Sequence, residues 1–373
     1  LELFFLLYGL AVIISIFIGS LLDGAVYGRD FLELLRLAKY WLIVRLALSL
    51  SWSEEHAGRA IQVLLWIGLV GACIALAQAN NAFGINDIYT PLFVKDIRLD
   101  SIQRHVPGTI LNYNLFGTFL AMISALALSA LLFAPLSFKR KALTAAILVV
   151  SVAALVRTTS RGAFIALILA VILLWLLRLS LMRSHRALHA LTLTVIVVFG
   201  IILGGAILRE PETLSADHPR RAFVSRFQPE HVERGFGLRA ADWELALDLA
   251  SESIVFGTGP SKDEGIRAFH SEYLTHLRRY GLFGLAVYLA MLGASALTCL
   301  RLLRSGRIKA DGYARVLLAG TLGMVCVFVV TSAIYQVFDQ LQLAAIFWWF
   351  VGIAFAYSSF TSNRQRQQLA GSS

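Results

Sequence analysis

Charged residues are scarce in this sequence, and their scarcity excludes most soluble folds. Only 15% of the 373 residues are charged and 58% are hydrophobic, whereas a soluble domain carries about a quarter charged residues. The ten-residue alternating segments of a membrane β-barrel are also missing. Apolar runs of about 17 to 23 residues, the length that crosses a bilayer, recur instead. The sequence therefore predicts an all-α, polytopic transmembrane helix bundle.

Cysteine is scarce too, since Cys73, Cys299 and Cys326 are the only three, and each falls in an apolar run. They lack metal-ligand spacing, so we expect them to pack as small hydrophobic residues rather than to form a disulfide or a metal site. The first apolar run has neither the basic segment nor the cleavage site of a secretory signal. Because the sequence begins with Leu1, we expect the natural N-terminus, with an initial helix, to lie before it.

The formal net charge of +10 does not indicate a nucleic-acid partner, because membrane proteins collect basic residues in their cytoplasmic loops. The apolar runs predict ten spans, of which the second is the weakest because Lys39 and Arg45 interrupt it. The spans are 3–22, 37–51, 59–79, 109–133, 142–158, 162–180, 188–208, 282–300, 314–336 and 340–360. Basic clusters follow the fourth, sixth, eighth and tenth spans, so they share one side, which the positive-inside rule makes cytoplasmic.

The opposite, periplasmic side carries one segment at about 80–108 and a longer one at 209–281. The chain thus divides into seven spans over 1–208, a periplasmic catalytic loop over 209–281, and three spans with a cytoplasmic tail over 282–373. We expect the 209–281 loop to form an α-helical cap.

Two amphipathic helices are predicted within this cap. In GLRAADWELALDLAS (237–251), Leu238, Ala241, Leu245 and Leu249 recur at helical spacing, which suits a helix at the membrane interface or across the end of the bundle. The Gly- and Pro-containing stretch FGTGP (256–260) then breaks the helix. A second amphipathic segment begins near Lys262 and runs into the eighth span.

Most basic residues of this loop are arginine, whose planar fork matches phosphate oxygens in a bidentate fashion. The loop is also rich in acidic residues, so the alternative is a solvated surface on which many arginines pair. Arg104 precedes the fourth span on the same side. Arg161 lies in the tight turn TTSRG, where it either lines a polar cavity or reaches out to the lipid headgroups.

These residues resemble the O-antigen ligase and polymerase superfamily of bacterial membrane glycosyltransferases. Four stretches carry the resemblance, in the order of the family: PGTILNYNLFGTFLA (107–121), TSRGAFIAL (159–167), GLRAADWELAL with FGTGP (237–260), and HSEYLTHLRRYGLFGL (270–285). In the last stretch, His270 and Ser271 are followed by nine residues and then by Gly281 and Gly284.

The resemblance implies a fold of the GT-C type and a site at the periplasmic face of the bacterial inner membrane. It implies transfer of a glycan from an undecaprenyl-diphosphate donor to lipid A–core, to a growing glycan or to a protein hydroxyl. The reaction inverts the anomeric carbon and requires no metal or other cofactor. The expected partners are that donor, the acceptor and membrane lipid.

The resemblance also assigns roles to residues. Arg239 matches the motif arginine, so it is expected to bind the diphosphate, whose departure builds negative charge that fixed cations stabilise. Weaker candidates for this task are Arg161, Arg104, Lys262 and Arg267. His270 is the candidate that orients and deprotonates the acceptor hydroxyl, although a capping or packing role is the alternative. Tyr273 and Asn114 are candidate contacts of the sugar or acceptor, and His276 is interpreted as structural.

Three functions remain open. The His-Ser-x9-Gly-x-x-Gly pattern favours a ligase. Arg221 and Gly237 have a spacing that polymerases share, but a chain with 28 Gly produces such spacings by chance. A transporter of the same lipid-linked glycan is the remaining alternative, which the lack of interrupted, repeated spans disfavours.

Overall fold

The computed structural model describes residues 1–23, 27–50, 53–88, 105–181, 229–260, 269–305 and 312–370. Within these ranges the regular structure is entirely helical, so the prediction of an all-α bundle is confirmed. The predicted span 188–208 and the candidate residues Arg104, Lys262 and Arg267 lie outside the described residues.

Seven of the described helices are long and apolar enough to cross a membrane, which makes this a multi-pass membrane protein. They are α1 (Glu2–Asp23), α3 (Glu54–Ala79), α6 (Tyr113–Phe133), α7 (Phe138–Thr158), α8 (Arg161–Leu181), α12 (Glu272–Arg304) and α13 (Tyr313–Ser332). Helix α14 (Leu341–Ala370) contributes a shorter apolar stretch, Leu341–Tyr357. Two short 3-10 helices, η1 (Ala82–Gly84) and η2 (Gly108–Ile110), lie between α3 and α6.

Helix α2 (Gly28–Ser49) occupies the place of the second predicted span but starts nine residues before its expected beginning at residue 37 (28 against 37). It is not among the seven membrane-length apolar helices. Lys39 and Arg45 are both exposed. Arg45 forms an ion pair with Glu2 of α1, so the charge that weakened the prediction is paired with the neighbouring helix.

The core of the bundle lies around α6 and α13, whose residues are buried on nearly all sides. Glycines bring these helices close to their neighbours. A Cβ on Gly320 of α13 would lie 2.5 Å from Leu126 of α6, and one on Gly117 of α6 would lie 2.8 Å from Ser160 before α8. Substitution would push the helices apart, so these glycines fix the central packing.

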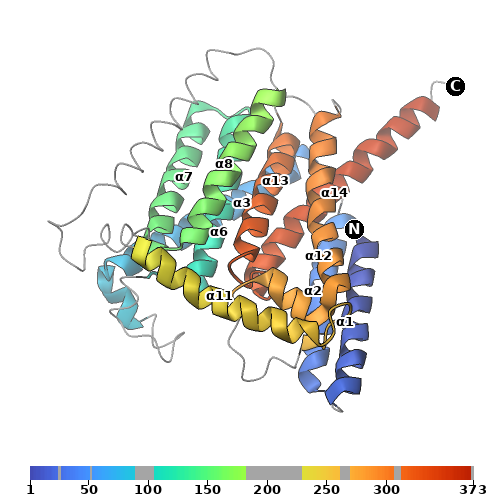
Figure 1. Ribbon diagram of the computed structural model, residues 1–373. Helices are drawn as coiled ribbons and strands as arrows, with labels where there is room; N and C mark the ends of the chain where they lie inside the picture. Colours follow the sequence, from blue (N-terminus) through green and yellow to red (C-terminus); the bar gives the residue numbers. More distant parts are fainter. Residues whose placement is uncertain are drawn as a thin grey trace.

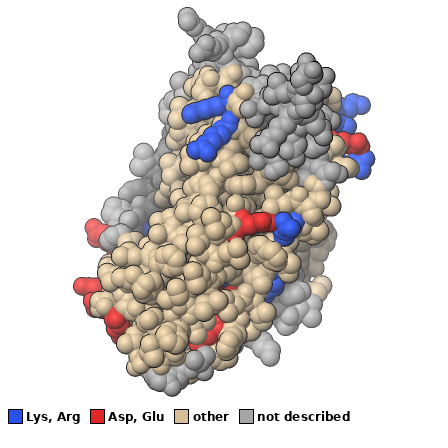
Figure 2. Space-filling model, turned by 90° about the vertical axis from the view of Figure 1, so that its right-hand side faces the viewer, with Lys and Arg blue, Asp and Glu red and all other residues tan. Residues whose placement is uncertain are grey.

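The outer helices expose apolar side chains, as expected of surfaces that face lipid. On α1 the exposed residues recur every three or four positions, on one side of the helix. They are Leu3, Leu6, Leu10, Ile13, Phe17 and Leu21. Figure 2 shows this side of the molecule as a broad uncharged face, with basic residues toward its upper edge and acidic residues toward its lower edge.

Helix α11 (Pro229–Ser251) lies across the lower end of the bundle, roughly perpendicular to the other helices (Figure 1). We call this the site end; α6, α8 and α12 begin there. We call the opposite end the basic end, because Lys139, Arg140 and Lys141 open α7 there and Arg301 and Arg304 close α12. The predicted sorting of charge between the two ends is therefore present in the described residues.

Candidate functional site

The turn between α7 and α8 sits at the site end in a strained conformation. Thr159 has a φ of 57°, which is rare for a β-branched residue. Its hydroxyl oxygen lies 2.7 Å from Nδ1 of His105, and the His105 ring packs against Tyr113 with 5.3 Å between centroids. Such strain persists where surrounding contacts impose it, and it is common at functional sites. This turn leads directly into α8, whose first residue is Arg161.

Tyr335, from the turn between α13 and α14, packs directly on this helix start. A Cβ on Gly162 would lie 3.0 Å from Cε2 of Tyr335, so only glycine leaves room for the ring. Burial raises the pKa of the Tyr335 hydroxyl, whereas the positive charges of Arg239 and Arg161 act to lower it. Arg161 opens α8 directly before Gly162, so Tyr335 packs on the same helix start that carries Arg161.

Arg239 reaches this region from α11. Its guanidinium carbon lies 5.8 Å from the centroid of the Tyr335 ring, in cation–π geometry. Arg161 and Arg239 are far apart in the sequence, but Arg239 contacts the Tyr335 ring and that ring packs on Gly162, the residue after Arg161. Two arginines near one helix start suit an anion.

His270 lies just before the start of α12 and beside α11. Its Nε2 atom is 3.8 Å from Oδ2 of Asp242, a residue one helical turn after Arg239 on α11. The His270 side chain is 51% exposed, and its φ of 49° is in the left-handed region. An exposed imidazole beside a carboxylate can accept a proton from a substrate hydroxyl, so α11 holds the arginine and the histidine partner in a single rigid element.

The buried side of α11 differs from the predicted apolar face. Ala246 and Ala250 are buried, whereas Leu245 is 43% exposed and Ala241 is also exposed. The predicted face that contains Ala241 and Leu245 therefore points away from the bundle at these two positions, and the bundle is contacted one position further along the helix. The small alanines allow α11 to lie close to the bundle, and with Asp242 they form one stripe at four-residue spacing.

Helix α12 is interrupted at Gly281, where φ is 66° and ψ is −169°. The break frees two backbone N–H groups from the helix. Leu282 donates to the carbonyl of Ile254 at 2.8 Å and Phe283 to that of Val255 at 3.1 Å. The chain that leaves α11 is thus bound by its backbone to the break in α12.

The FGTGP stretch completes this junction. The Gly259 N–H donates to the carbonyl of Arg279 at 2.9 Å, and a Cβ on Gly257 would lie 2.3 Å from the same oxygen. Both glycines have positive φ. The glycine motifs of α11 and α12 therefore serve one purpose, which is to fix α11 against the start of α12 and so to set His270 beside Asp242.

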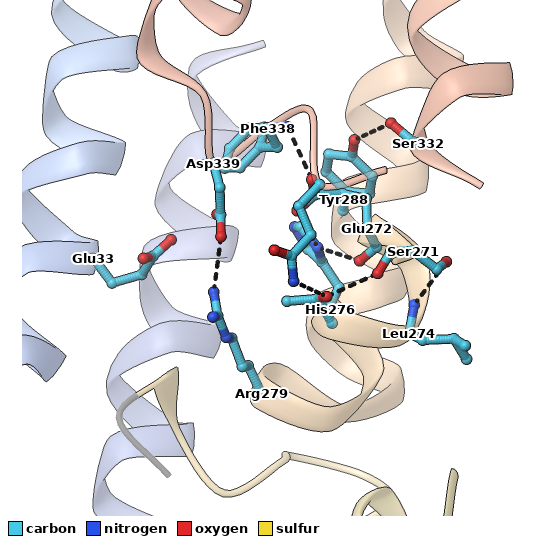
Figure 3. A network of polar contacts seen from close by, with 12 residues as sticks. Glu33, Ser271, Glu272, Leu274, His276, Arg279, Tyr288, Ser332, Phe338 and Asp339 are labelled. Atoms are coloured by element: carbon cyan, nitrogen blue, oxygen red, sulfur yellow. Dashed lines mark hydrogen bonds and ion pairs between the residues drawn. The ribbon is translucent and has the colours of Figure 1, made fainter. Parts of the chain in front are cut away.

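Four residues of the turn between α13 and α14 make contacts that fix its position. Beyond Tyr335, Gln336 donates to the Thr275 hydroxyl at 2.8 Å. The Phe338 N–H donates to the Glu272 carboxylate at 2.9 Å, a contact visible in Figure 3. Helix α12 thus supports the ring on which Arg239 rests.

Asp339 closes the same turn with two ion pairs. Its carboxylate accepts from Arg36 of α2 at 2.5 Å and from Arg279 of α12 at 3.2 Å. Figure 3 shows Arg279 pointing at Asp339, with Glu33 nearby; Glu33 itself pairs with Arg36 at 2.9 Å. Burial alone would raise the pKa of Asp339, but Arg279 and Arg36 outweigh it and hold that pKa below its ordinary value.

His276 lies in the packed interior. Its Nε2 is 2.7 Å from the Tyr8 hydroxyl and its Nδ1 is 2.8 Å from the Glu272 carbonyl. The ring stacks on Tyr288 at 4.2 Å. These contacts join α1 to α12 and give His276 a packing role, away from the exposed His270.

The two candidate sugar contacts, Tyr273 and Asn114, lie at the site end. Their hydrogen bonds in the described part of the chain are to residues other than His270. The Tyr273 hydroxyl donates to the Val329 carbonyl of α13 at 2.6 Å, so it holds two helices together. Asn114 is partly buried in the first turn of α6, behind the N-cap residue Asn112, whose side chain accepts from the Asn114 N–H at 2.9 Å. Neither residue is shown to contact the Arg239 and Arg161 region.

Four residues of this region did not stand out in the sequence: His105, Asp242, Tyr335 and Asp339. The spacing of Asp242, one turn after Arg239, is the only sequence signal that could have indicated any of them. In the part of the chain that the structure describes, no three His, Cys, Asp or Glu side chains are grouped so that they could hold a metal ion.

Residues 146–289 match the model of the O-antigen ligase family. This range begins in α7 and ends in α12, so it contains Arg161, Arg239 and His270 with the junction that positions them. This match supports the resemblance to the O-antigen ligase superfamily that the four motif stretches indicate. No curated protein matches the sequence.

Proposed function

We propose that this protein is an O-antigen ligase that transfers a glycan from undecaprenyl diphosphate to a hydroxyl of lipid A–core. The observation that carries this proposal is the contact of Arg239 with Tyr335, whose ring packs on Gly162 next to Arg161, together with the His270–Asp242 pair one helical turn along α11 from Arg239. The arginine pair suits a diphosphate leaving group, and the histidine suits an acceptor hydroxyl.

In this mechanism the acceptor oxygen attacks the anomeric carbon from the side opposite the diphosphate, so the configuration inverts. The bond from that carbon to the phosphate oxygen breaks, and its electron pair passes to the diphosphate. Arg239 and Arg161 stabilise the added negative charge, because cations held in place before the reaction need not reorganise as it develops. The mechanism requires no metal or cofactor.

His270 takes the proton that the acceptor hydroxyl loses. A neutral imidazole is a suitable base near pH 7. Asp242, at 3.8 Å, is too distant for a hydrogen bond in the free protein but close enough to stabilise the imidazolium once it forms. The exposed His270 side chain then passes the proton to water.

The charge distribution supports a periplasmic site in the bacterial inner membrane. Exposed basic residues gather at the basic end, among them Lys139, Arg140 and Arg301, and the positive-inside rule assigns such an end to the cytoplasm. The site end then faces the periplasm, where α11 acts as a cap at the level of the lipid headgroups.

A transfer assay with the purified protein tests the proposal. We expect Arg239→Ala, Arg161→Ala and His270→Ala each to lower kcat by about 100-fold or more, with expression and folding retained. Arg45→Ala is the matched control, because Arg45 is exposed and pairs with Glu2 away from the site. Full transfer by both Arg239→Ala and His270→Ala would refute the mechanism.

The choice of acceptor separates a ligase from a polymerase. The assay is run with undecaprenyl-diphosphate glycan alone and again with lipid A–core added. A ligase forms product only in the second reaction. Longer donor-linked chains in the first reaction would instead identify a polymerase, and uptake of donor into vesicles without transfer would identify a transporter.

A further inference from the structure

Arg278, in the first part of α12, is a buried cation whose guanidinium is incompletely hydrogen-bonded. The residue is 3% exposed, and among the described residues its Nε and Nη1 atoms have no hydrogen-bond partner. The adjacent Arg279 is different, because it pairs with Asp339 at 3.2 Å. Buried polar groups are ordinarily hydrogen-bonded, so two buried guanidinium nitrogens without a partner require an explanation.

The direction of Arg278 follows from the contacts of its neighbours on α12. His276 points to Tyr8 of α1, Tyr273 to the carbonyl of Val329 in α13, and Arg279 to the Asp339 turn and α2. Successive helical residues are separated by 100°, so Arg278 points away from all three. Helices α1, α13, α14 and α11 pack against α12. Because α14 follows the Asp339 turn, α11 is the one that none of these three contacts reaches.

We call the contact region between α11 and the first part of α12 the seam. The α11 side of the seam provides no buried charge to match Arg278. The buried residues of α11 are Ala246 and Ala250, whose side chains cannot accept a hydrogen bond. Asp242 lies on the same stripe but is near His270, with 3.8 Å between Oδ2 and Nε2. Among the described residues, the buried charge in the seam is therefore the positive charge of Arg278.

A second polar group is left without a partner at the same junction. The Oγ1 atom of Thr258 is buried and has no hydrogen-bond partner, and the residue is 3% exposed. Its backbone N–H donates to the carbonyl of Arg278 at 3.4 Å, so the two residues are held next to each other. A guanidinium and a hydroxyl are both donors to a phosphate group.

We propose that Arg278 and Thr258 form a binding site for a phosphate group that enters the seam between α11 and α12. Two sources share this chemistry: the diphosphate of the polyprenyl donor and the headgroup of an anionic phospholipid. The first source rests on the proposed function, whereas the second does not. In either case the bound phosphate provides the negative charge that the described residues lack.

Thermal unfolding in nanodiscs of phosphatidylcholine tests the site without any measurement of activity. The Arg278→Met variant replaces the incompletely hydrogen-bonded cation with an apolar side chain of similar length, so we expect its unfolding midpoint to rise in this neutral lipid. The matched control is Arg279→Met, which breaks an ion pair and is expected to lower the midpoint. Arg278→Lys keeps the charge without the planar fork and should bind phosphate more weakly.

Two additions then identify the source of the phosphate. One arm adds undecaprenyl diphosphate, and the other replaces part of the lipid with phosphatidylglycerol. We expect one of them to raise the midpoint of the wild-type protein and of Arg279→Met by several degrees, and to raise that of Arg278→Met by less than half as much.

The outcomes separate this proposal from the proposed function. A lower midpoint for Arg278→Met in neutral lipid, or an equal response of Arg278→Met and wild type to both additions, would overturn the phosphate site. Either result would leave the transfer assay unaffected. Conversely, a response to phosphatidylglycerol alone would support the site even if no glycan transfer were found.

Discussion

The guanidinium carbon of Arg239 lies 5.8 Å from the centroid of the Tyr335 ring, and the ring in turn packs on Gly162 at the start of α8. Arginine side chains lose considerable rotamer entropy when they are fixed. The aromatic face reduces the number of orientations open to Arg239 before substrate arrives. Tyr335 is therefore a positioning residue, which acts through Arg239.

We predict that Tyr335→Leu lowers kcat of glycan transfer by about tenfold, because a cation–π contact at a partly desolvated site contributes on the order of 1 kcal/mol or more. Tyr335→Phe keeps the ring face and should retain most of the activity. Kinetic assays of both variants, with donor and acceptor varied separately, test this. Equal losses for Phe and Leu would assign the effect to the hydroxyl instead.

Gly281 is predicted to be essential for folding. Its backbone conformation is open almost only to glycine, and a Cβ there would lie 2.3 Å from the backbone of Val255. We expect Gly281→Ala to destabilise the protein by about 3 kcal/mol or more, measured as a lower unfolding midpoint in detergent.

The control for Gly281 is Gly293, in the same helix, where an added Cβ meets nothing within 4 Å. Gly293→Ala should leave the midpoint unchanged or raise it slightly, since alanine is favoured in helices by about 1 kcal/mol. A stable, active Gly281→Ala protein would show that the break in α12 is dispensable.

The spans and the glycine junction could be predicted from the sequence because their signals are local. A long apolar run indicates a membrane helix whatever its neighbours are, and the four motif stretches have fixed spacings within themselves. The same local motifs make His270 and Arg239 candidates for the site. The described structure adds that the FGTGP stretch and Gly281 meet at one junction.

Tyr335 and Asp339 could not be predicted, because their roles depend on contacts between distant segments. Nothing in the stretch YQVFDQ indicates that α2, α11 and α12 all meet there. The side of α11 that packs on the bundle could not be predicted for a related reason. A pattern of leucines predicts an apolar face, but lipid and protein both accept leucine, so Leu245 faces outward while the smaller Ala246 packs inward.

Asp339 is predicted to make stability depend on acid pH. Its pKa is held below the ordinary value of about 3.9, so the ionised carboxylate stabilises the fold above that pH and loses this effect as pH falls below it. Asp339→Asn removes the carboxylate that pairs with both Arg36 and Arg279, which costs about 3 kcal/mol or more near pH 7. Unfolding midpoints measured from pH 7 to pH 2 should show a difference between the variant and wild type that narrows below about pH 3.9. A constant difference across this range would contradict the role of the carboxylate charge.

The pair of His270 and Asp242 yields a prediction about rate. Asp242→Asn keeps the shape of the side chain but removes the charge that favours the imidazolium, so kcat should fall by about tenfold while KM for the donor stays nearly constant. Asp248→Asn is the matched control, as Asp248 is exposed on the same helix. If Asp242→Asn and Asp248→Asn both show the same rates as the wild type, then His270 acts without help from α11.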